Sequence, residues 1–194
     1  MDKKYILPIT FVVVVLIQLW VPVSMIWKSE AVLREGREFH FKTAPIDPID
    51  PFRGNYIILS FDADEHLTST DTTWQSNELA YVLLGVDSTG FAEILSVTRK
   101  MPENNTDYFK TSIYYAWQDS VDTKLSLNFP FDRYYMEESK AYEAERAVRE
   151  SVSDSTQVAY AIVCIKDGEA RLKDVMVDEV PIKEWVEQLM KELD

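Results

Sequence analysis

The most prominent pattern in the chain is an almost unbroken apolar segment close to its beginning. Tyr5 to Trp27 contains only a few mildly polar residues, and a helix of that length crosses the roughly 30 Å hydrocarbon core of a bilayer. Lys3 and Lys4 precede the segment, which favours an N-terminus in the cytoplasm. Because no small-residue cleavage site follows, we expect a retained signal-anchor rather than a cleaved signal peptide.

This pattern divides the chain into an N-terminal membrane anchor over residues 1–28 and an extracytoplasmic domain over residues 29–194. The expected location is the cytoplasmic (inner) membrane, crossed once, with the C-terminal domain outside. The lipid bilayer is then a partner of the chain through the apolar segment.

Beyond the anchor, the hydrophobic period becomes that of β-strands. Phe39 and Phe41 alternate with polar neighbours, and apolar or alternating runs predict further strands over 55–61, 78–86, 91–100, 108–117, 124–129, 157–165 and 170–177. Phe109, Ile113 and Tyr115 are expected on one face of their strand. Two glycine-containing turns, at residues 87–90 and 166–168, predict β-hairpins.

Helical spacing returns towards the end of the chain. Ala141, Ala144, Val148 and Val152 recur at the helical period, and residues 182–193 predict an amphipathic helix with Trp185, Val186, Leu189 and Leu193 facing inward. The expected fold class is α+β: a transmembrane helix followed by a mainly antiparallel β domain with one or two peripheral helices.

Composition narrows the functional classes. The 194 residues carry a net charge of −13 without a basic patch, which argues against nucleic acid as a partner. The single cysteine, Cys164, supports no intramolecular disulfide and lies in an alternating run, as a small core residue does.

A proline-rich stretch, Ala44 to Phe61, organises the start of the domain. Pro45, Pro48 and Pro51 exclude a helix and stiffen an extended loop that ends at Arg53 and Gly54. A strand rich in aromatic and β-branched residues follows. The guanidinium of Arg53 has natural partners in the preceding carboxylates, Asp47 and Asp50.

The sequence GNYIILSF, from Gly54 to Phe61, resembles the motif of the GDYXXLXY family, and the upstream PIDPIDPFRG is similar to its context. Asn55 stands where the family name has Asp, and Phe61 where it has Tyr, so neither residue can act as an acid or base. A later segment also resembles the family; its matching residues are Asp132, Arg133, Tyr134, Tyr135 and Glu138. The resemblance implies a bacterial setting, no established activity, and a multispanning membrane protein as a partner.

The candidate site combines carboxylates, arginines and tyrosines from both motifs, with a glycine that shapes the turn: Asp47, Asp50, Arg53, Gly54, Tyr56, Asp132, Arg133, Tyr134 and Glu138. No catalytic triad, Cys/His metal spacing or phosphate loop occurs, so no metal or cofactor is expected and an enzyme is the less favoured class. We expect a structural or partner-binding domain. The alternatives are a cell-envelope module for a sugar, peptide or anion and, with less support, a carboxylate-dependent hydrolase.

The two motifs are also expected to meet. The strand after Gly54 is predicted to pack near Phe131 to Tyr135, with Arg53 or Arg133 bridging the two segments through a carboxylate.

Overall fold

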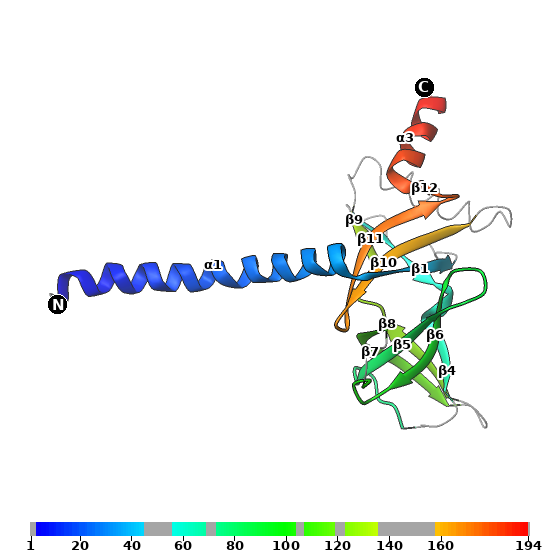
Figure 1. The fold of residues 1–194 in the computed structure, drawn as a ribbon, viewed down its shortest axis with the longest axis horizontal. Helices are drawn as coiled ribbons and strands as arrows, with labels where there is room; N and C mark the ends of the chain where they lie inside the picture. Colours follow the sequence, from blue (N-terminus) through cyan, green and yellow to red (C-terminus); the bar gives the residue numbers. More distant parts are fainter. Residues whose placement is uncertain are drawn as a thin grey trace.

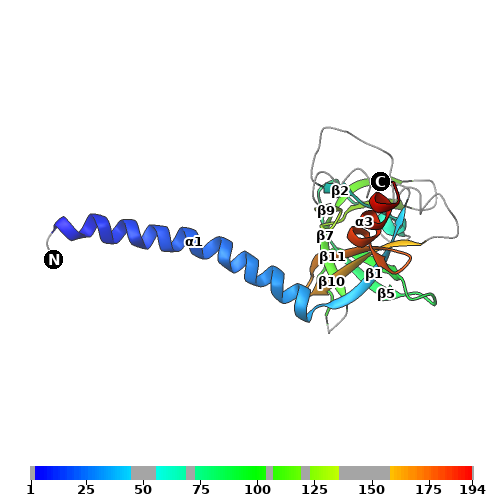
Figure 2. The same cartoon turned by 90° about the horizontal axis from the view of Figure 1, so that it is seen from above.

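The computed structural model describes residues 3–44, 56–68, 73–103, 107–118, 123–135 and 158–193. One long helix, α1 (Lys3–Glu35), projects from the domain, with the N-terminus at its far end (Figure 1, Figure 2). By length and composition, its part Pro8–Glu35 is suited to span a membrane. The expected boundary after residue 28 falls within α1, which continues unbroken to Glu35.

The domain after α1 consists mainly of β-strands, with the helix α3 (Ile182–Leu193) near its end and the short 3-10 helix η1 (Asp62–Asp64) between two strands. The strands are β1 (Arg37–Ala44), β2 (Tyr56–Ile58), β3 (Ser60–Phe61), β4 (Glu65–Thr68), β5 (Leu79–Val86), β6 (Ala92–Thr98), β7 (Tyr108–Gln118), β8 (Thr123–Asn128), β9 (Arg133–Tyr135), β10 (Ala159–Lys166), β11 (Glu169–Val177) and β12 (Val180–Pro181).

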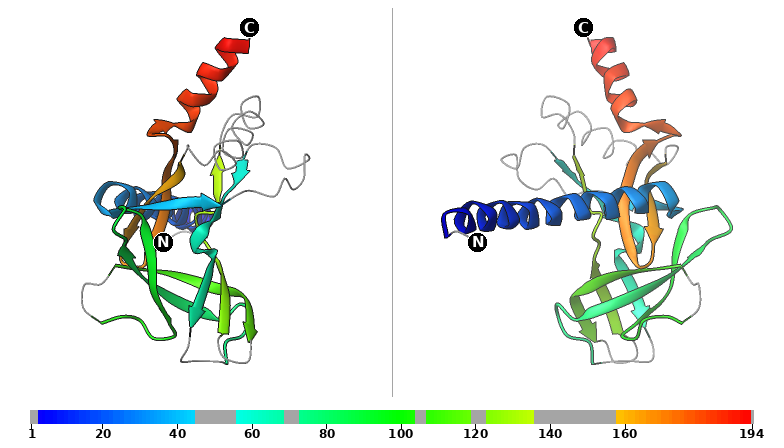
Figure 3. Two further views of the ribbon diagram at one scale, coloured as in Figure 1. Left: turned by 90° about the vertical axis from the view of Figure 1, so that its right-hand side faces the viewer. Right: turned by 60° about the vertical axis from the view of Figure 1, so that its left-hand side comes forward.

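The described strands form three antiparallel sheets. The β1 sheet has the order β12-β11-β10-β1-β3, the β7 sheet has the order β4-β8-β7-β5-β6, and β2 pairs with β9 in a two-stranded ribbon. Figure 3 shows the strands of the β7 sheet lying beneath β1, β10 and β11. The expected α+β fold is confirmed, as are the hairpins β5–β6 and β10–β11.

The core between the two large sheets is built on phenylalanine. Alternation along β1 directs Phe39 and Phe41 inward, where both are at most 2% exposed. Phe41 belongs to a group of rings in mutual contact, with neighbouring centroids 5.0–6.5 Å apart. This phenylalanine cluster consists of Phe41, Phe61, Phe109, Phe129 and Phe131. It joins β1 and β3 of one sheet to β7 of the other.

Two strand predictions need correction. The strand expected over 55–61 is divided at Leu59, so that its first half pairs with β9 and its second half with β1. In β7 the register shifts between Ile113 and Tyr115, and this β-bulge places Tyr115 on the solvent side, 58% exposed, instead of beside buried Ile113.

The helix predictions have two outcomes. The helix expected over 182–193 is confirmed as α3, in which Ile182 is buried and Trp185 packs against the core. The helical spacing at residues 141–152, and the side chains expected to face inward at 186, 189 and 193, lie outside the described residues.

The last turns of α1 pack directly on the β10–β11 hairpin. Val32 is buried, and the thiol of buried Cys164 lies 3.6 Å from the carbonyl oxygen of Leu33. The backbone N–H of Gly36 closes the helix on the carbonyl of Val32, at 2.9 Å. A Cβ at Gly36 would collide with that carbonyl, so the chain passes from helix to strand within one residue because glycine occupies this position.

Candidate functional site

The structure describes residues 56–61 of the first motif and residues 132–135 of the second. Asp132, Arg133 and Tyr134 lie in or beside β9, and the backbone of Tyr56 begins β2. The other candidate residues lie outside the described residues: Asp47, Asp50, Arg53, Gly54 and Glu138.

The two motifs lie side by side, as expected. In the β2–β9 ribbon Tyr56 is opposite Tyr135 and Ile58 is opposite Arg133. The backbone N–H of Leu59 then donates to the carbonyl of Asp132 at 2.7 Å. The prediction that the strand after Gly54 packs near residues 131–135 is therefore confirmed.

Apolar side chains reinforce this backbone pairing. Phe61, the last residue of the first motif, lies with its ring centroid 5.4 Å from that of Phe131, the residue before Asp132. Both rings are 2% exposed. Sequence reasoning treated Phe61 as a departure from the family and did not select Phe131, although NFPFD repeats phenylalanine at alternate positions, which is the signal of a shared inward face.

The expected arginine bridge stays a prediction, because Arg53 and most of the candidate carboxylates lie outside the described residues. Arg133 forms an ion pair of 3.8 Å with its neighbour Asp132, and both side chains are about half exposed. This pair joins adjacent residues of one segment, so it does not connect the motifs. Screening by water makes such a pair weak.

Tyr134 makes a specific polar contact with a residue outside the motifs. Its hydroxyl donates to Oδ1 of Asp174 at 2.8 Å, and its side chain is only 7% exposed. Oδ1 also accepts from the backbone N–H of Val175 at 2.8 Å. The ammonium of Lys183 lies 5.5 Å from the tyrosine ring centroid, within cation–π range.

A β-bulge aims Asp174 at this tyrosine. The β10–β11 register shifts so that Ile162 is opposite Asp174 while Val163 is opposite Leu172. Burial, followed by the bond to Asp174, raises the pKa of Tyr134 well above its ordinary value. The phenol therefore acts as a hydrogen-bond donor rather than as a base. Sequence reasoning missed Asp174, because no local pattern marks a contact with a residue 40 positions away.

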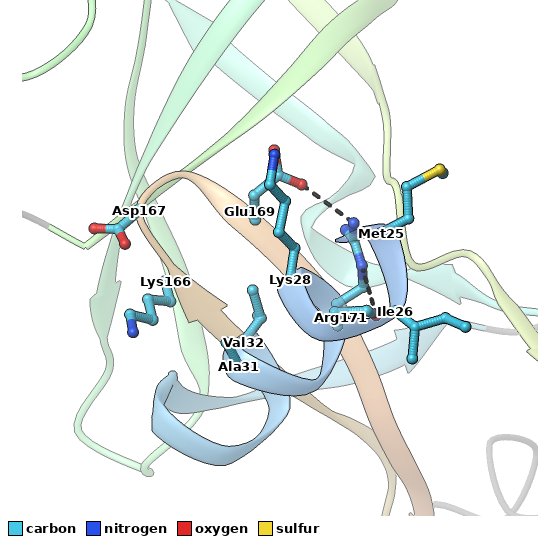
Figure 4. Close-up of a pocket in the computed structure, with 10 residues that line it drawn as sticks. Met25, Ile26, Lys28, Ala31, Val32, Lys166, Asp167, Glu169 and Arg171 are labelled. Atoms are coloured by element: carbon cyan, nitrogen blue, oxygen red, sulfur yellow. Dashed lines mark hydrogen bonds and ion pairs between the residues drawn. The ribbon is translucent and has the colours of Figure 1, made fainter. Parts of the chain in front are cut away.

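A cavity of about 780 Å³ lies at the junction of α1 with the β10–β11 hairpin, and none of its lining residues belongs to either motif. Figure 4 shows the last turns of α1 crossing the hairpin, with Lys166 and Asp167 at the left of the picture and Met25 and Ile26 at the right. Its lining residues are Met25, Ile26, Lys28, Ser29, Ala31, Val32, Lys166, Asp167, Glu169 and Arg171.

Charged groups fix the geometry of this junction. Arg171 lies 3.3 Å from a carboxylate oxygen of Glu169 and donates from Nε to the hydroxyl of Ser29 at 3.2 Å. Lys166 forms an ion pair with Glu35 at the end of α1, and this contact raises the pKa of Lys166. Lys28 forms no hydrogen bond or ion pair with the described part of the chain.

Metal and thiol chemistry receive no support from the described residues. Among them, no three His, Cys, Asp or Glu side chains gather as a metal site requires. Cys164 is buried, and burial raises the pKa of its thiol, which lowers its reactivity.

An exposed apolar helix joined without a linker to an antiparallel β domain defines a class of proteins suited to single-span anchoring. The family model described as GDYXXLXY protein matches residues 18–175, from within α1 to β11. The chain therefore belongs to the GDYXXLXY family. No curated protein and no solved structure gives a match.

Proposed function

We propose that this chain is a single-pass membrane protein whose extracytoplasmic domain is a structural or partner-binding module, and that its partner is a multispanning membrane protein. The observation that carries the proposal is the direct passage of α1 into the domain. The helix ends at Glu35, β1 begins at Arg37, and Val32 is already buried against the hairpin. A domain joined in this way holds a fixed orientation to the bilayer, which favours a surface that meets another membrane protein.

An exposed apolar surface on the β7 sheet supports a partner-binding role. Four large side chains on β5 and β7 are each more than half exposed, although strands β5 and β7 bury their other face in the core. Such clusters mark interaction sites on soluble domains. We call this surface the aromatic face; it consists of Leu79, Tyr114, Tyr115 and Trp117.

The experiment is photocrosslinking in intact cells that produce the full chain. A photoreactive phenylalanine analogue replaces Trp117 or Tyr115, and the same analogue at exposed Thr89 or Glu179 is the control. We expect an adduct with one multispanning membrane protein from the aromatic face and none from the control positions. Adducts with soluble proteins alone, or equal adducts from all four positions, contradict the proposal.

The orientation has its own test. Lys3 and Lys4 precede the apolar segment and favour a cytoplasmic N-terminus. A reporter enzyme that works only outside the cytoplasm should therefore be active when it is fused after Asp194. If the fusion is active instead with a reporter that works only in the cytoplasm, the orientation is contradicted, and the crosslinking result is not affected.

The alternative, a cell-envelope ligand-binding module, has one structural observation in its favour. The cavity at the α1 junction combines charged and apolar lining groups, as ligand sites do.

A further inference from the structure

The junction cavity lies where the apolar segment of α1 ends. Met25 and Ile26, which are 65% and 60% exposed, line it on the side of the apolar segment, and Lys28 follows less than one turn later. If the segment crosses the bilayer as proposed, a helix rise of about 1.5 Å per residue places Lys28 within a few ångströms of the hydrocarbon boundary. The cavity then opens at the level of the lipid headgroups.

The charges that line the cavity have both signs. Lys28, Lys166 and Arg171 are cationic, while Asp167 and Glu169 are anionic. Lys166 and Arg171 each have a carboxylate partner, whereas Lys28 has none within the described part of the chain. A ligand that carries both a phosphate and an ammonium group matches this lining better than a simple anion does.

We propose that the junction cavity binds a phospholipid with a phosphoethanolamine headgroup from the surrounding leaflet, an inference that rests on the proposed membrane anchoring. The phosphate lies against Lys28 and against Arg171, whose outer nitrogens also contact the carbonyl of Ala170 and the carboxylate of Glu169. The primary ammonium donates to Glu169, Asp167 adds negative charge from the other side of the turn (Figure 4), and the acyl chains follow Met25 and Ile26 into the bilayer. A volume of about 780 Å³ is within the range of small-ligand sites and holds such a headgroup.

Headgroup chemistry separates the candidate lipids. Phosphatidylglycerol lacks an ammonium and adds negative charge beside a chain that already carries −13. Phosphatidylcholine has the same net charge as phosphatidylethanolamine, but its quaternary ammonium has no N–H to donate to Glu169. The cavity should therefore bind phosphatidylethanolamine more tightly than phosphatidylcholine, and both of these more tightly than phosphatidylglycerol.

The test uses the full chain, purified in detergent and freed of lipid, and counts bound lipid by native mass spectrometry during titration with each of the three phospholipids. Lys28→Gln should weaken the binding of phosphatidylethanolamine and phosphatidylcholine about tenfold, because a charge-assisted hydrogen bond to phosphate is lost. Lys173→Gln is the matched control, since this lysine is exposed on the same hairpin but does not line the cavity. Its affinities should equal those of the unmodified chain.

A second variant tests the ammonium contact. Asp167→Asn combined with Glu169→Gln should abolish the preference for ethanolamine over choline while the phosphate contact of Lys28 remains. Neither variant removes a core side chain, because Lys28, Asp167 and Glu169 are all exposed. The proposal is overturned if the unmodified chain binds the three lipids with equal affinity. It is also overturned if the Lys28→Gln chain binds phosphatidylethanolamine as tightly as the unmodified chain does.

Soluble glycerophosphoethanolamine distinguishes a lipid from a free phosphate compound. It should compete with the lipid only weakly, because it lacks the acyl chains that contact Met25 and Ile26; competition as strong as that of the lipid contradicts a lipid ligand. Extraction of the chain from cell membranes by alkaline carbonate would refute the proposed anchoring, whereas lipid counting in detergent does not depend on that result.

Discussion

The phenylalanine cluster and the α1 junction are held together by different forces. The cluster consists of buried rings with centroids 5.0–6.5 Å apart, contributed by both large sheets and by the segment that leads into β9. At the junction, Val32 is buried, but the ion pair of Lys166 with Glu35 and that of Lys173 with Glu38 are both solvent-exposed. Burial of apolar area is the larger contribution to stability, and exposed ion pairs contribute little.

This difference separates two properties of the molecule. The phenylalanine cluster determines whether the domain folds, whereas the junction determines how the folded domain is oriented to its helix. Substitutions at the two places should therefore change different measurements, and the expected changes in stability decrease from the cluster to the exposed ion pairs.

The largest effect is expected from Phe131→Ala. This ring contacts four other phenylalanines, and its removal leaves a cavity among them, which should lower the free energy of unfolding by about 4 kcal/mol. Denaturant unfolding, followed by tryptophan fluorescence, measures the change. Tyr114→Ala, at a position 67% exposed, is the control and should change stability by less than about 0.5 kcal/mol. A loss below about 1 kcal/mol for Phe131→Ala contradicts the role given to the cluster.

Gly36→Ala should act on the junction. The added Cβ would collide with the carbonyl of Val32 and lie 3.1 Å from backbone atoms of Ile165, so the end of α1 must shift at a cost of roughly 2 kcal/mol. Spin labels can be attached to cysteines introduced at positions 20 and 89, because the single native cysteine is buried. In the Gly36→Ala chain the distance distribution between the two labels should be broader than in the chain with the native glycine. Arg34→Ala, on the exposed side of the same helix, should leave the distribution narrow; equal distributions for both variants contradict a glycine requirement.

Tyr134→Phe removes one buried hydrogen bond to a carboxylate and should lower the free energy of unfolding by about 1.5 kcal/mol at neutral pH. The pKa of Tyr134 is raised on folding from its ordinary value of 10.0. The contribution of the protonated phenol to stability is therefore complete below pH 10.0 and is lost as the pH rises above that value. The unmodified chain should therefore lose more stability than the variant between about pH 9 and about pH 11. Parallel pH profiles of the melting temperature would show that the phenol is not held protonated.

The smallest effect is expected from Glu35→Gln, which breaks an exposed ion pair with Lys166. The melting temperature should fall by less than for Tyr134→Phe, and raising the salt concentration from about 0.05 M to about 0.5 M should remove the difference by screening. A difference that persists at high salt would show that the junction depends on this pair for more than charge attraction.

Features with local signals were predictable from the sequence. The apolar segment, the Lys166–Gly168 turn and the amphipathic end of the chain each depend on neighbouring residues, and each is present as α1, the β10–β11 hairpin or α3. The division of the strand at Leu59 was not predictable, because it depends on which distant strand each half meets. The exposure of Tyr115 follows from a bulge that alternation alone does not reveal.

The candidate site shows the same limit. The described contacts between the motifs are backbone pairing and phenylalanine packing, whereas the expected arginine bridge stays a prediction because Arg53 lies outside the described residues. Asp174 was missed because a bulge aims it at Tyr134 from another strand. The junction cavity was missed because its two walls, the end of α1 and the β10–β11 hairpin, come together only when β1 pairs with β10.

The pairing of β1 with β10 also determines when the domain can be completed during synthesis. Glu35 and Lys166, which meet at the edge of this pair, are 131 residues apart. At elongation rates of about 5–20 residues per second, β1 waits on the order of 10 s for its partner after leaving the ribosome. Throughout that interval β1 follows α1 with one edge unpaired, and its phenylalanines, which are buried in the folded domain, still lack the partner strand β10. A protein that covers this edge during synthesis would act before the mature fold exists.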